Sequence, residues 1–278
     1  MPLAFSKMHG AGNDFVVLDL RGGLPPPSVA TIRAIGDRHT GVGFDQLMSV
    51  EDSTRADCVA RYRIWNSDGT SAVQCGNGAR CVAAWVVRAG IGAPPRFVLD
   101  SPSGPIAVEC LADGRFSLDM GRPRFAPDEV PMQSARAAPS YTTVVAGEAL
   151  QFGAAAVGNP HAVIEVPDVA SADVARIGPA LQALTLFPAG VNVGFAQVVD
   201  EGHIRLRVHE RGAGETLACG SGACAAVAVL ARQGRVGTHV DVDLPGGRLT
   251  IDWPGGDAPI RMAGPAAFVF EGQWLAAG

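Results

Sequence analysis

The sequence contains almost no lysine. Among its 278 residues, 22 are lysine or arginine, and Lys7 is the one lysine in that group. Pyridoxal enzymes hold their cofactor as a Schiff base on a lysine side chain, whereas Lys7 stands close to the start of the chain and outside any pocket motif. The composition therefore argues against pyridoxal chemistry, and we expect a protein that works without a cofactor.

The chain also lacks the basic charge and the long apolar runs of two other protein classes. Its formal net charge of −5 is the opposite of what a nucleic-acid partner requires. No stretch approaches the roughly 20 apolar residues of a membrane span, and the first fifteen residues have no apolar core of a signal peptide. With 47% hydrophobic and 18% charged residues, we expect a globular cytoplasmic protein without a membrane or nucleic-acid partner.

Its six cysteines are too few and too scattered for a secreted disulfide framework. They stand at positions 58, 75, 81, 110, 219 and 224. None forms a Cys-x-x-Cys pair, and no histidine stands at a zinc-ligand interval from them. We therefore expect neither a disulfide framework nor a metal site.

What the chain does contain is an internal repeat. The segment GNDFVV at Gly12–Val17 returns as GNPHAV at Gly158–Val163, and CGNGARC at Cys75–Cys81 returns as CGSGAC at Cys219–Cys224. The two pairs are offset by 146 and 144 residues and occur in the same order. Two related halves of domain size are therefore predicted, packed with their equivalent sites facing each other.

Two weaker features accompany the repeat. The letters GFDQ at 43–46 match GFAQ at 194–197, at an offset of 151. Nine residues before each repeated cysteine stands a polar residue, Asn66 in the first half and Glu210 in the second. We interpret the polar residues as partners of the two cysteines.

Short strands and a few helices are predicted in both halves. Short β-rich segments bounded by Gly, Pro or Asp predict strands at 15–20, 62–66, 96–101, 105–110, 115–120, 161–166, 191–199, 203–210, 239–244, 248–253 and 266–272. Helices are expected at 28–37, 79–89, 173–184 and 223–232. The second and the fourth of these helices are apolar nearly all round and should be buried, with Gly90 and Gly234 closing them. The Pro- and Ala-rich stretch 123–139 is expected to link the halves.

Each Cys-Gly-x-Gly motif precedes a buried helix, so Cys75 and Cys219 are expected at helix N-termini. Unpaired backbone N–H groups and the helix dipole favour an anion there, which should lower the pKa of each thiol. The same N–H groups would form a cradle for a substrate carboxylate. A carboxylate held between two such cradles would place its α-carbon between two sulfur atoms.

That arrangement suits the inversion of a stereocentre. A base on one face and an acid on the other must exchange roles in the reverse reaction, so two groups of similar pKa are required. Without pyridoxal, the fixed dipoles of the cradle must stabilise the developing carbanion. A disulfide between Cys75 and Cys219 is the redox alternative, which we interpret as a side reaction of the same geometry.

These motifs together resemble those of the diaminopimelate epimerase family. The segments KMHGAGNDFVVLD, RHTGVGFDQL, WNSDGTSAVQCGNGARC, GNPHAV, GVNVGF and HERGAGETLACGSGACA follow in the family's order and span residues 7 to 226. The resemblance implies a pyridoxal-independent epimerase that interconverts LL- and meso-diaminopimelate in lysine biosynthesis. It assigns Cys75 and Cys219 as the acid–base pair.

The resemblance also implies the remaining site residues. Gly76, Asn77, Gly220 and Ser221 hold the reacting carboxylate, and Glu210 receives the reacting ammonium. His161 and Glu210 are placed to modulate the pKa of the thiols. The distal amino-acid end is held by Asn66, Asn159, Asn192 and Arg211, and the pocket is completed by Asn13 and Gln46.

The family fold is α+β, with two pseudo-symmetric domains that each wrap a curved, barrel-like mixed sheet around a central helix. The expected domains are residues 1–119 with Cys75 and residues 120–264 with Cys219, and the terminal strand at about 265–278 returns to the first domain. The family is homodimeric. A tyrosine that is frequent at its dimer contact is replaced here by Phe270.

Three alternatives remain open at the level of sequence. The first is another cofactor-free amino-acid racemase of the same fold, of the proline or hydroxyproline type, for which the cysteine contexts fit less well. A substrate with one carboxylate would also leave the Asn and Arg groups of the distal receptor unpaired. The second is a catalytically silent relative, which should lack one of the two cysteines. The third is a redox switch that needs the disulfide for function.

Overall fold

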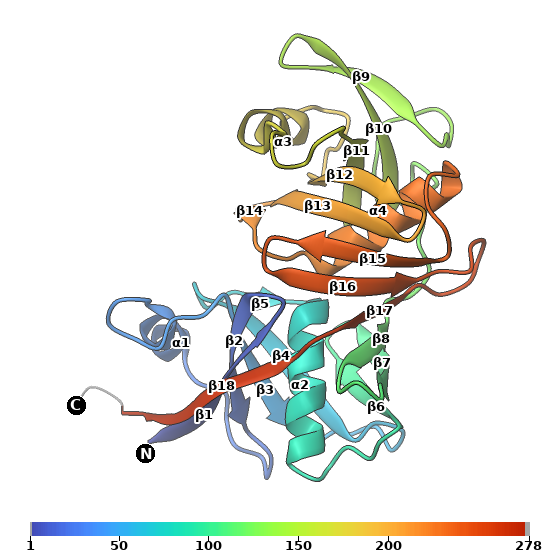
Figure 1. The fold of residues 1–278 in the computed structure, drawn as a ribbon. Coiled ribbons are helices and arrows are strands. Elements are labelled where there is room, and N and C mark those ends of the chain that lie inside the picture. The colour runs from blue at the N-terminus through green and yellow to red at the C-terminus, as the bar shows by residue number, and fades with distance from the viewer. Residues whose placement is uncertain (1, 276–278) are drawn as a thin grey trace. The chain divides into compact units, whose positions relative to one another are not determined.

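The computed structural model describes residues 2–275, and by its internal contacts it divides into two units (Figure 1). The first unit comprises Met1–Leu118 and Gly264–Gly278, and the second comprises Asp119–Ala263. Each unit is a mixed β-sheet with two helices, so the predicted α+β class with two pseudo-symmetric parts is confirmed.

The sheet of the first unit contains the chain's first eight strands and its last. Its strands are β1 (Leu3–Gly10), β2 (Asn13–Asp19), β3 (Gln46–Glu51), β4 (Ala60–Asn66), β5 (Ser71–Ala72), β6 (Arg96–Ser101), β7 (Gly104–Cys110), β8 (Phe116–Asp119) and β18 (Ala267–Trp274). They pair in the order β18–β1–β2–β3–β4–β6–β7–β8, with the short β5 beside β4. The pairs β2–β3 and β4–β6 are parallel, and the others are antiparallel.

The sheet of the second unit repeats this order. Its strands are β9 (Tyr141–Val145), β10 (Glu148–Ala156), β11 (Pro160–Glu165), β12 (Asn192–Asp200), β13 (His203–Glu210), β14 (Gly214–Thr216), β15 (His239–Leu244), β16 (Gly247–Asp252) and β17 (Arg261–Gly264). They pair in the order β9–β10–β11–β12–β13–β15–β16–β17, with β14 beside β13. The parallel pairs, β11–β12 and β13–β15, stand where the first unit has β2–β3 and β4–β6.

Strand register fixes which residues of the two units correspond. Phe15 lies opposite Gln46 in the parallel pair β2–β3, and His161 lies opposite Asn192 in the pair β11–β12. Gln46 therefore corresponds to Asn192, at the offset of 146 residues that also relates Phe15 to His161. The predicted match of GFDQ with GFAQ is wrong, because four letters without a strand register can align by chance.

The two buried helices carry the repeated cysteines at their starts. They are α2 (Gly76–Arg88) and α4 (Gly220–Arg232), and the N-cap residues are Cys75 and Cys219. Both begin three residues earlier than predicted, because the motif glycines themselves form the first turn. Helix α2 packs on β1, β2 and β3, and α4 packs on β10 to β13 and on β16. As predicted, Gly90 and Gly234 follow the helix ends with positive φ angles of 73° and 69°.

The remaining two helices lie where the sequence predicts them. They are α1 (Val29–Gly36) in the first unit and α3 (Val174–Gln182) in the second. The hydroxyl of Ser28 accepts a hydrogen bond from the backbone N–H of Thr31 and thereby caps α1.

The segment 123–139 is part of the second unit, so the prediction of a linker there is wrong. Val130 and Met132 are buried in that unit's core beside Phe152 and Phe187. The backbone of Arg124 also exchanges two hydrogen bonds with Ala156. The proline and alanine content of residues 123–139 is typical of a linker, but the segment packs against the core because the side chains of Val130 and Met132 are apolar and buried.

Candidate functional site

Cys75 caps helix α2 with its own side chain. The residue is extended, with φ −156° and ψ 101°, and its Sγ accepts a hydrogen bond from the backbone N–H of Gly78 at 3.3 Å. The N–H groups of Gly76 and Asn77 belong to the same first turn, where a helix provides no carbonyl partner. The first unit thus joins a thiol to a group of backbone donors suited to an anion.

A chain of polar side chains surrounds Cys75. Asn13, the first residue of β2, receives on its Oδ1 both the Cys75 thiol at 3.8 Å and Nδ2 of Asn77 at 3.4 Å. Arg80 is fully buried and donates to Oδ1 of Asn77 at 2.8 Å. Sequence reasoning missed Arg80, although a charged residue directly before the apolar run at 81–87, one turn after Asn77, was the signal.

Gln46 and Asn66 form a second polar pair in the first unit. They lie opposite each other where β3 begins and β4 ends, and Nε2 of Gln46 donates to Oδ1 of Asn66 at 3.1 Å. Asn66 in turn donates to the hydroxyl of Thr70 at 3.0 Å. Since β2 also begins at this edge of the sheet, Asn13 lies on the same edge as this pair.

Cys219 occupies the equivalent helix start in the second unit but is more deeply buried. It is 4% exposed, and its thiol donates to Oε2 of Glu210 at 3.1 Å. The Ser221 hydroxyl lies 3.7 Å from the same sulfur. The other oxygen of Glu210 accepts a hydrogen bond from the hydroxyl of Thr216, which the sequence did not point to.

The acidity expected for Cys219 is contradicted. Burial raises the pKa of this thiol well above its ordinary value, and the charge of Glu210 and the hydrogen bond to it raise it further. The backbone N–H of Gly222 and the Ser221 hydroxyl lower the pKa, but by less. The prediction considered the helix N-terminus alone, whereas the adjacent carboxylate and the loss of solvent outweigh it.

His161 is fully buried, and Ser221 lies between its ring and the thiol of Cys219. Its Nε2 lies 2.9 Å from Oδ1 of Asn159 and 3.1 Å from the hydroxyl of Ser221. Because Oδ1 only accepts, Nε2 carries the proton, and the buried Nδ1 has no hydrogen-bond partner among residues 2–275. Burial lowers the pKa of His161 to about 3, so the ring is neutral.

In the second unit, Asn192 and Arg211 form a further group of polar residues. Asn192 is buried, donates to the carbonyl of Pro160 at 3.1 Å, and accepts from the backbone N–H of Arg211 at 2.9 Å. The exposed guanidinium of Arg211 donates to the carbonyl of Ala189. The side chain of Arg211 is therefore at the surface while its backbone is fixed beside Asn192.

The surroundings of the two thiols differ in chemistry between the units. The neighbour of the thiol is an amide in the first unit, Asn13, and a carboxylate in the second, Glu210, which by strand register corresponds to Asn66 and not to Asn13. At the position of His161 the first unit has Phe15. The repeat therefore preserves the cysteine at the helix start, while the residues that set its proton affinity have diverged.

Two features are absent from residues 2–275. No group of three or more His, Cys, Asp or Glu side chains within this range is arranged to hold a metal ion. Over the same residues, no helix combines the length and the apolar character needed to span a membrane.

Solved structures with the same fold define the class of protein. A probable proline racemase from Agrobacterium radiobacter K84 superimposes with a TM-score of 0.69, covering 99% of this chain and 93% of its own at 18% identity. A phenazine biosynthesis protein of the PhzF family from Bacillus anthracis gives a TM-score of 0.70, with 99% of both chains covered at 16% identity. The chain thus has the two-domain α+β fold that these proteins share.

Sequence relatives identify the family within this class. The model of the family described as diaminopimelate epimerase matches residues 5–126 and 153–269. The diaminopimelate epimerase of Xanthomonas axonopodis pv. citri (strain 306) is 56% identical over 273 residues, which are 98% of this chain and 96% of that protein. That of Xylella fastidiosa (strain M12) is 53% identical over 274 residues, with the same coverage. The chain belongs to the diaminopimelate epimerase family, a family of isomerases.

Proposed function

We propose that this chain interconverts LL- and meso-diaminopimelate by moving a proton at one α-carbon, with Cys75 and Cys219 as the acid–base pair. The observation that carries the proposal is the occurrence, in both units, of a cysteine at the N-terminus of a buried helix. Family membership supplies the substrate. One sulfur takes the proton as a thiolate, and the other, as a thiol, donates its proton to the opposite face of the same carbon.

The backbone of each helix start has a second role. The N–H groups of Gly76 and Asn77, with those of Gly220 and Ser221, hold the reacting α-carboxylate. Negative charge that develops on this carboxylate in the transition state meets donors and dipoles that are already oriented. This stabilisation replaces the electron sink that a cofactor would supply, and we propose that the enzyme uses none.

The polar side chains of the two units bind the rest of the substrate. Glu210 receives the reacting ammonium, and with His161 it modulates the proton affinity of the thiols. The distal carboxylate and ammonium are held by Asn66, Asn159, Asn192 and Arg211, while Asn13 and Gln46 complete the pocket. Amides offer both donors and acceptors, which suits a zwitterionic group.

Burial and the Glu210 carboxylate raise the pKa of the Cys219 thiol and favour its protonated form. The two sulfurs exchange roles between the stereoisomers, because the group that donates a proton in one direction accepts it in the other.

Further proposals concern the setting of the enzyme. We place it in the cytoplasm, in lysine biosynthesis, as a homodimer with Phe270 at the contact. The two epimerase halves are residues 1–119 and 120–264, and the terminal strand belongs to the first half, a division consistent with the contact units.

Turnover in deuterated water tests the mechanism. Starting from LL-diaminopimelate, deuterium is expected at the α-position of the meso product, measured by mass spectrometry, because the proton that is delivered comes from a solvent-exchanged thiol. Cys75→Ala and Cys219→Ala are each expected to reduce epimerisation by at least about 100-fold, since each removes one acid–base group.

The matched control is Cys110→Ala, which changes a half-buried cysteine on β7 and is expected to retain activity. Activity that survives loss of Cys75 or of Cys219 would contradict the two-base proposal. Turnover of proline without turnover of diaminopimelate would favour the racemase alternative, and activation by oxidation rather than by a thiol reductant would favour the redox alternative.

A further inference from the structure

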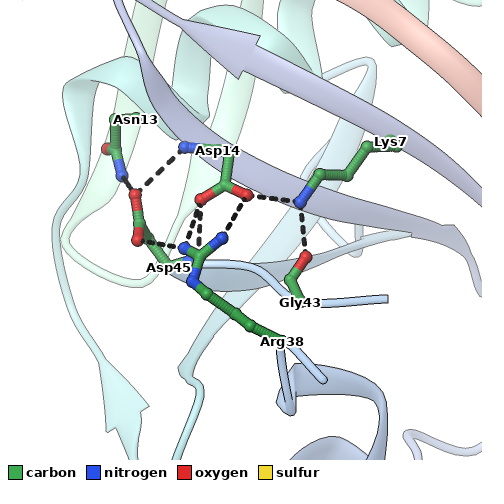
Figure 2. Close-up of polar contacts among 6 residues, drawn as sticks. All are labelled: Lys7, Asn13, Asp14, Arg38, Gly43 and Asp45. Carbon is green, nitrogen blue, oxygen red and sulfur yellow. Dashed lines mark hydrogen bonds and ion pairs between the residues drawn. The ribbon is translucent and has the colours of Figure 1, made fainter. Parts of the chain in front are cut away.

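A network of charged side chains lies at the edge of the first unit where β2 and β3 begin (Figure 2). The Arg38 guanidinium binds both carboxylate oxygens of Asp14, at 2.8 and 3.1 Å, and Oδ1 of Asp45 at 2.7 Å. Lys7, the one lysine of the chain, donates to Asp14 and to the carbonyl of Gly43. The network therefore joins β1, β2 and the segment that leads into β3.

Both carboxylates of this network stand next to residues of the proposed site. Asp14 follows Asn13, and Asp45 precedes Gln46. The two aspartates bind each other's backbone, because the N–H of Asp14 donates to the Asp45 carboxylate and the N–H of Asp45 donates to the Asp14 carboxylate, both at 3.1 Å. The positions of Asn13 and Gln46 are thus fixed relative to each other.

Charge keeps Asp14 in its ionised form. Burial alone would raise the pKa of this carboxyl, but hydrogen bonds from Arg38 and Lys7 outweigh burial and bring the pKa well below its ordinary value. Asp14 is therefore charged throughout the neutral pH range.

Asp45 also determines which end of the Asn13 amide faces the thiol. The two ends of an asparagine amide have nearly the same shape but opposite hydrogen-bonding character. A carboxylate only accepts, so it selects the amino end, and Nδ2 of Asn13 donates to Asp45 at 2.7 Å. The oxygen of Asn13 is therefore turned towards Cys75 and Asn77.

We propose that Asp45 is a positioning residue that fixes the amide orientation of Asn13, so that the Cys75 thiol meets an acceptor. The inference rests on the acid–base role proposed for Cys75. An acceptor beside the sulfur favours the thiol, whereas the N–H donor of Gly78 favours the thiolate. The sulfur of Cys75 thus meets both an acceptor and a donor, which suits a group that must both give and take a proton.

The second unit lacks this network at the corresponding positions. Asp14 corresponds to Pro160, and Asp45 corresponds to the fully buried Val191. The amide equivalent to Asn13 is that of Asn159, and it is held by its oxygen, which accepts from Nε2 of His161. Asp45 thus holds Asn13 by its amino end, whereas His161 holds Asn159 by its oxygen. The charged network acts beside the first thiol, that of Cys75.

Asp45→Asn tests this role, because an amide at position 45 can either accept from Nδ2 of Asn13 or donate to its Oδ1, and so no longer selects one end. Alkylation of Cys75 by iodoacetamide, measured on its peptide by mass spectrometry over a range of pH, reports the ionisation of this thiol. When Asn13 turns its amino end to the sulfur, the alkylation curve is expected to move to lower pH. The rate below the midpoint is expected to rise about threefold, the change produced by one weak hydrogen bond. The pH profile of epimerisation should move in the same direction.

Asp14→Asn is the matched control, because it removes one negative charge from the same network and leaves the bond from Asn13 to Asp45. Asp19→Asn, at the far end of β2 and paired with Arg21, controls for loss of a surface ion pair. Asp45 is 45% exposed, so its variant is expected to fold, which circular dichroism checks.

The proposal is supported if the alkylation curve of Cys75 moves to lower pH for Asp45→Asn and moves clearly less for both controls. Equal movement for Asp14→Asn would mean that charge acts through space. No movement for Asp45→Asn would mean that Asn77, whose Nδ2 donates to Oδ1 of Asn13, holds the amide without Asp45. Either result overturns the proposal. If Cys75→Ala stays active while the curve still moves, the proposed function fails and the positioning role stands.

Discussion

At the scale of single residues, the two catalytic candidates are equivalent in sequence but not in surroundings. Cys75 accepts a hydrogen bond from a backbone N–H and faces an amide oxygen, while Cys219 is buried against a carboxylate. At Cys219 the loss of solvent and the nearest side chain outweigh the helix dipole, an effect of a few tenths to one kcal/mol at an exposed site, and raise the pKa of the thiol.

Glu210→Gln tests the cause of the raised pKa of Cys219. The change removes the negative charge and keeps the shape, so the pKa of the Cys219 thiol is expected to fall and its alkylation at pH 8 to become faster. Epimerase activity should nevertheless drop by about 100-fold or more, because the proposed acceptor of the reacting ammonium is lost.

Glu215→Gln is the control for this variant. Glu215 is paired with Arg207 on the neighbouring strand and has no bond to Cys219. It is expected to leave both the alkylation rate and the activity unchanged. If Cys219 of the Glu210→Gln variant is alkylated at the wild-type rate, burial alone raises the pKa of this thiol.

His161 makes the stability of the protein depend on pH. Its pKa is about 3 when folded and near 6.5 when unfolded, so between these values the unfolded chain binds one more proton. The stability associated with the neutral ring is therefore complete above pH 6.5 and is lost as the pH falls towards 3. Its contribution to the free energy of unfolding declines by about 1.4 kcal/mol per pH unit.

His161→Phe, which introduces the residue found at the equivalent position 15, is expected to remove this slope. Urea unfolding of the variant and of the wild type at pH 6 and pH 5 provides the measurement. Ser221→Ala removes one hydrogen bond of the ring but keeps the ring, and should retain the wild-type slope. If the free energy of unfolding changes equally with pH in the wild type and in His161→Phe, the ring of His161 is not held neutral.

At the scale of elements, glycines decide how the repeated motif packs. A Cβ atom on Gly78 would lie 2.8 Å from Cε of Met48, and one on Gly222 would lie 3.2 Å from the Cys219 sulfur. The second glycine of each Cys-Gly-x-Gly motif therefore lets the helix start approach its sheet and the thiol.

The C-terminus of α2 offers a cleaner test of a glycine. Gly90 has a φ of 73° and open space around its missing Cβ, so Gly90→Ala adds backbone strain and no clash. The expected loss is about 1 kcal/mol in the free energy of unfolding, measured with urea. Gly237→Ala, where the added Cβ would meet Glu201 O at 3.5 Å, should change stability by less than about 0.5 kcal/mol. Equal losses would contradict a conformational cause.

Strands were predictable where local pattern and burial agree. The strands β13 and β15 occupy the predicted ranges 203–210 and 239–244, since both alternate between buried and more exposed residues. The strands β1 and β10 were missed. The first has the mixed sequence LAFSKMHG and the second the alanine-rich sequence EALQFGAAA, so pairing with neighbouring strands, not local propensity, makes them extended.

At the scale of the whole molecule, the proposed homodimer can be tested at one strand. Val269 and Phe270 on β18 are 55% and 48% exposed, an apolar pair on an edge strand. Sedimentation equilibrium is expected to give twice the monomer mass for the wild type, and the monomer mass for Phe270→Arg, because a charge at the contact opposes association.

Val144→Arg is the matched control for dimerisation. Val144 is 64% exposed on β9, which occupies in the second unit the edge position that β18 has in the first. This variant should remain dimeric. A Phe270→Arg protein that stays dimeric would place the contact elsewhere.

The sequence by itself determined the repeat, the buried helices, the cysteine that begins each of them and the resemblance to a family. All of these can be recognised from the composition of short segments and from their spacing along the chain. Tertiary structure alone decided the contact of Cys219 with Glu210, the neutrality of His161 and the hold of Asp45 on Asn13. These depend on burial and on side chains brought together from separate strands, and no local pattern encodes the hydrogen-bond partner or the loss of solvent that sets a pKa.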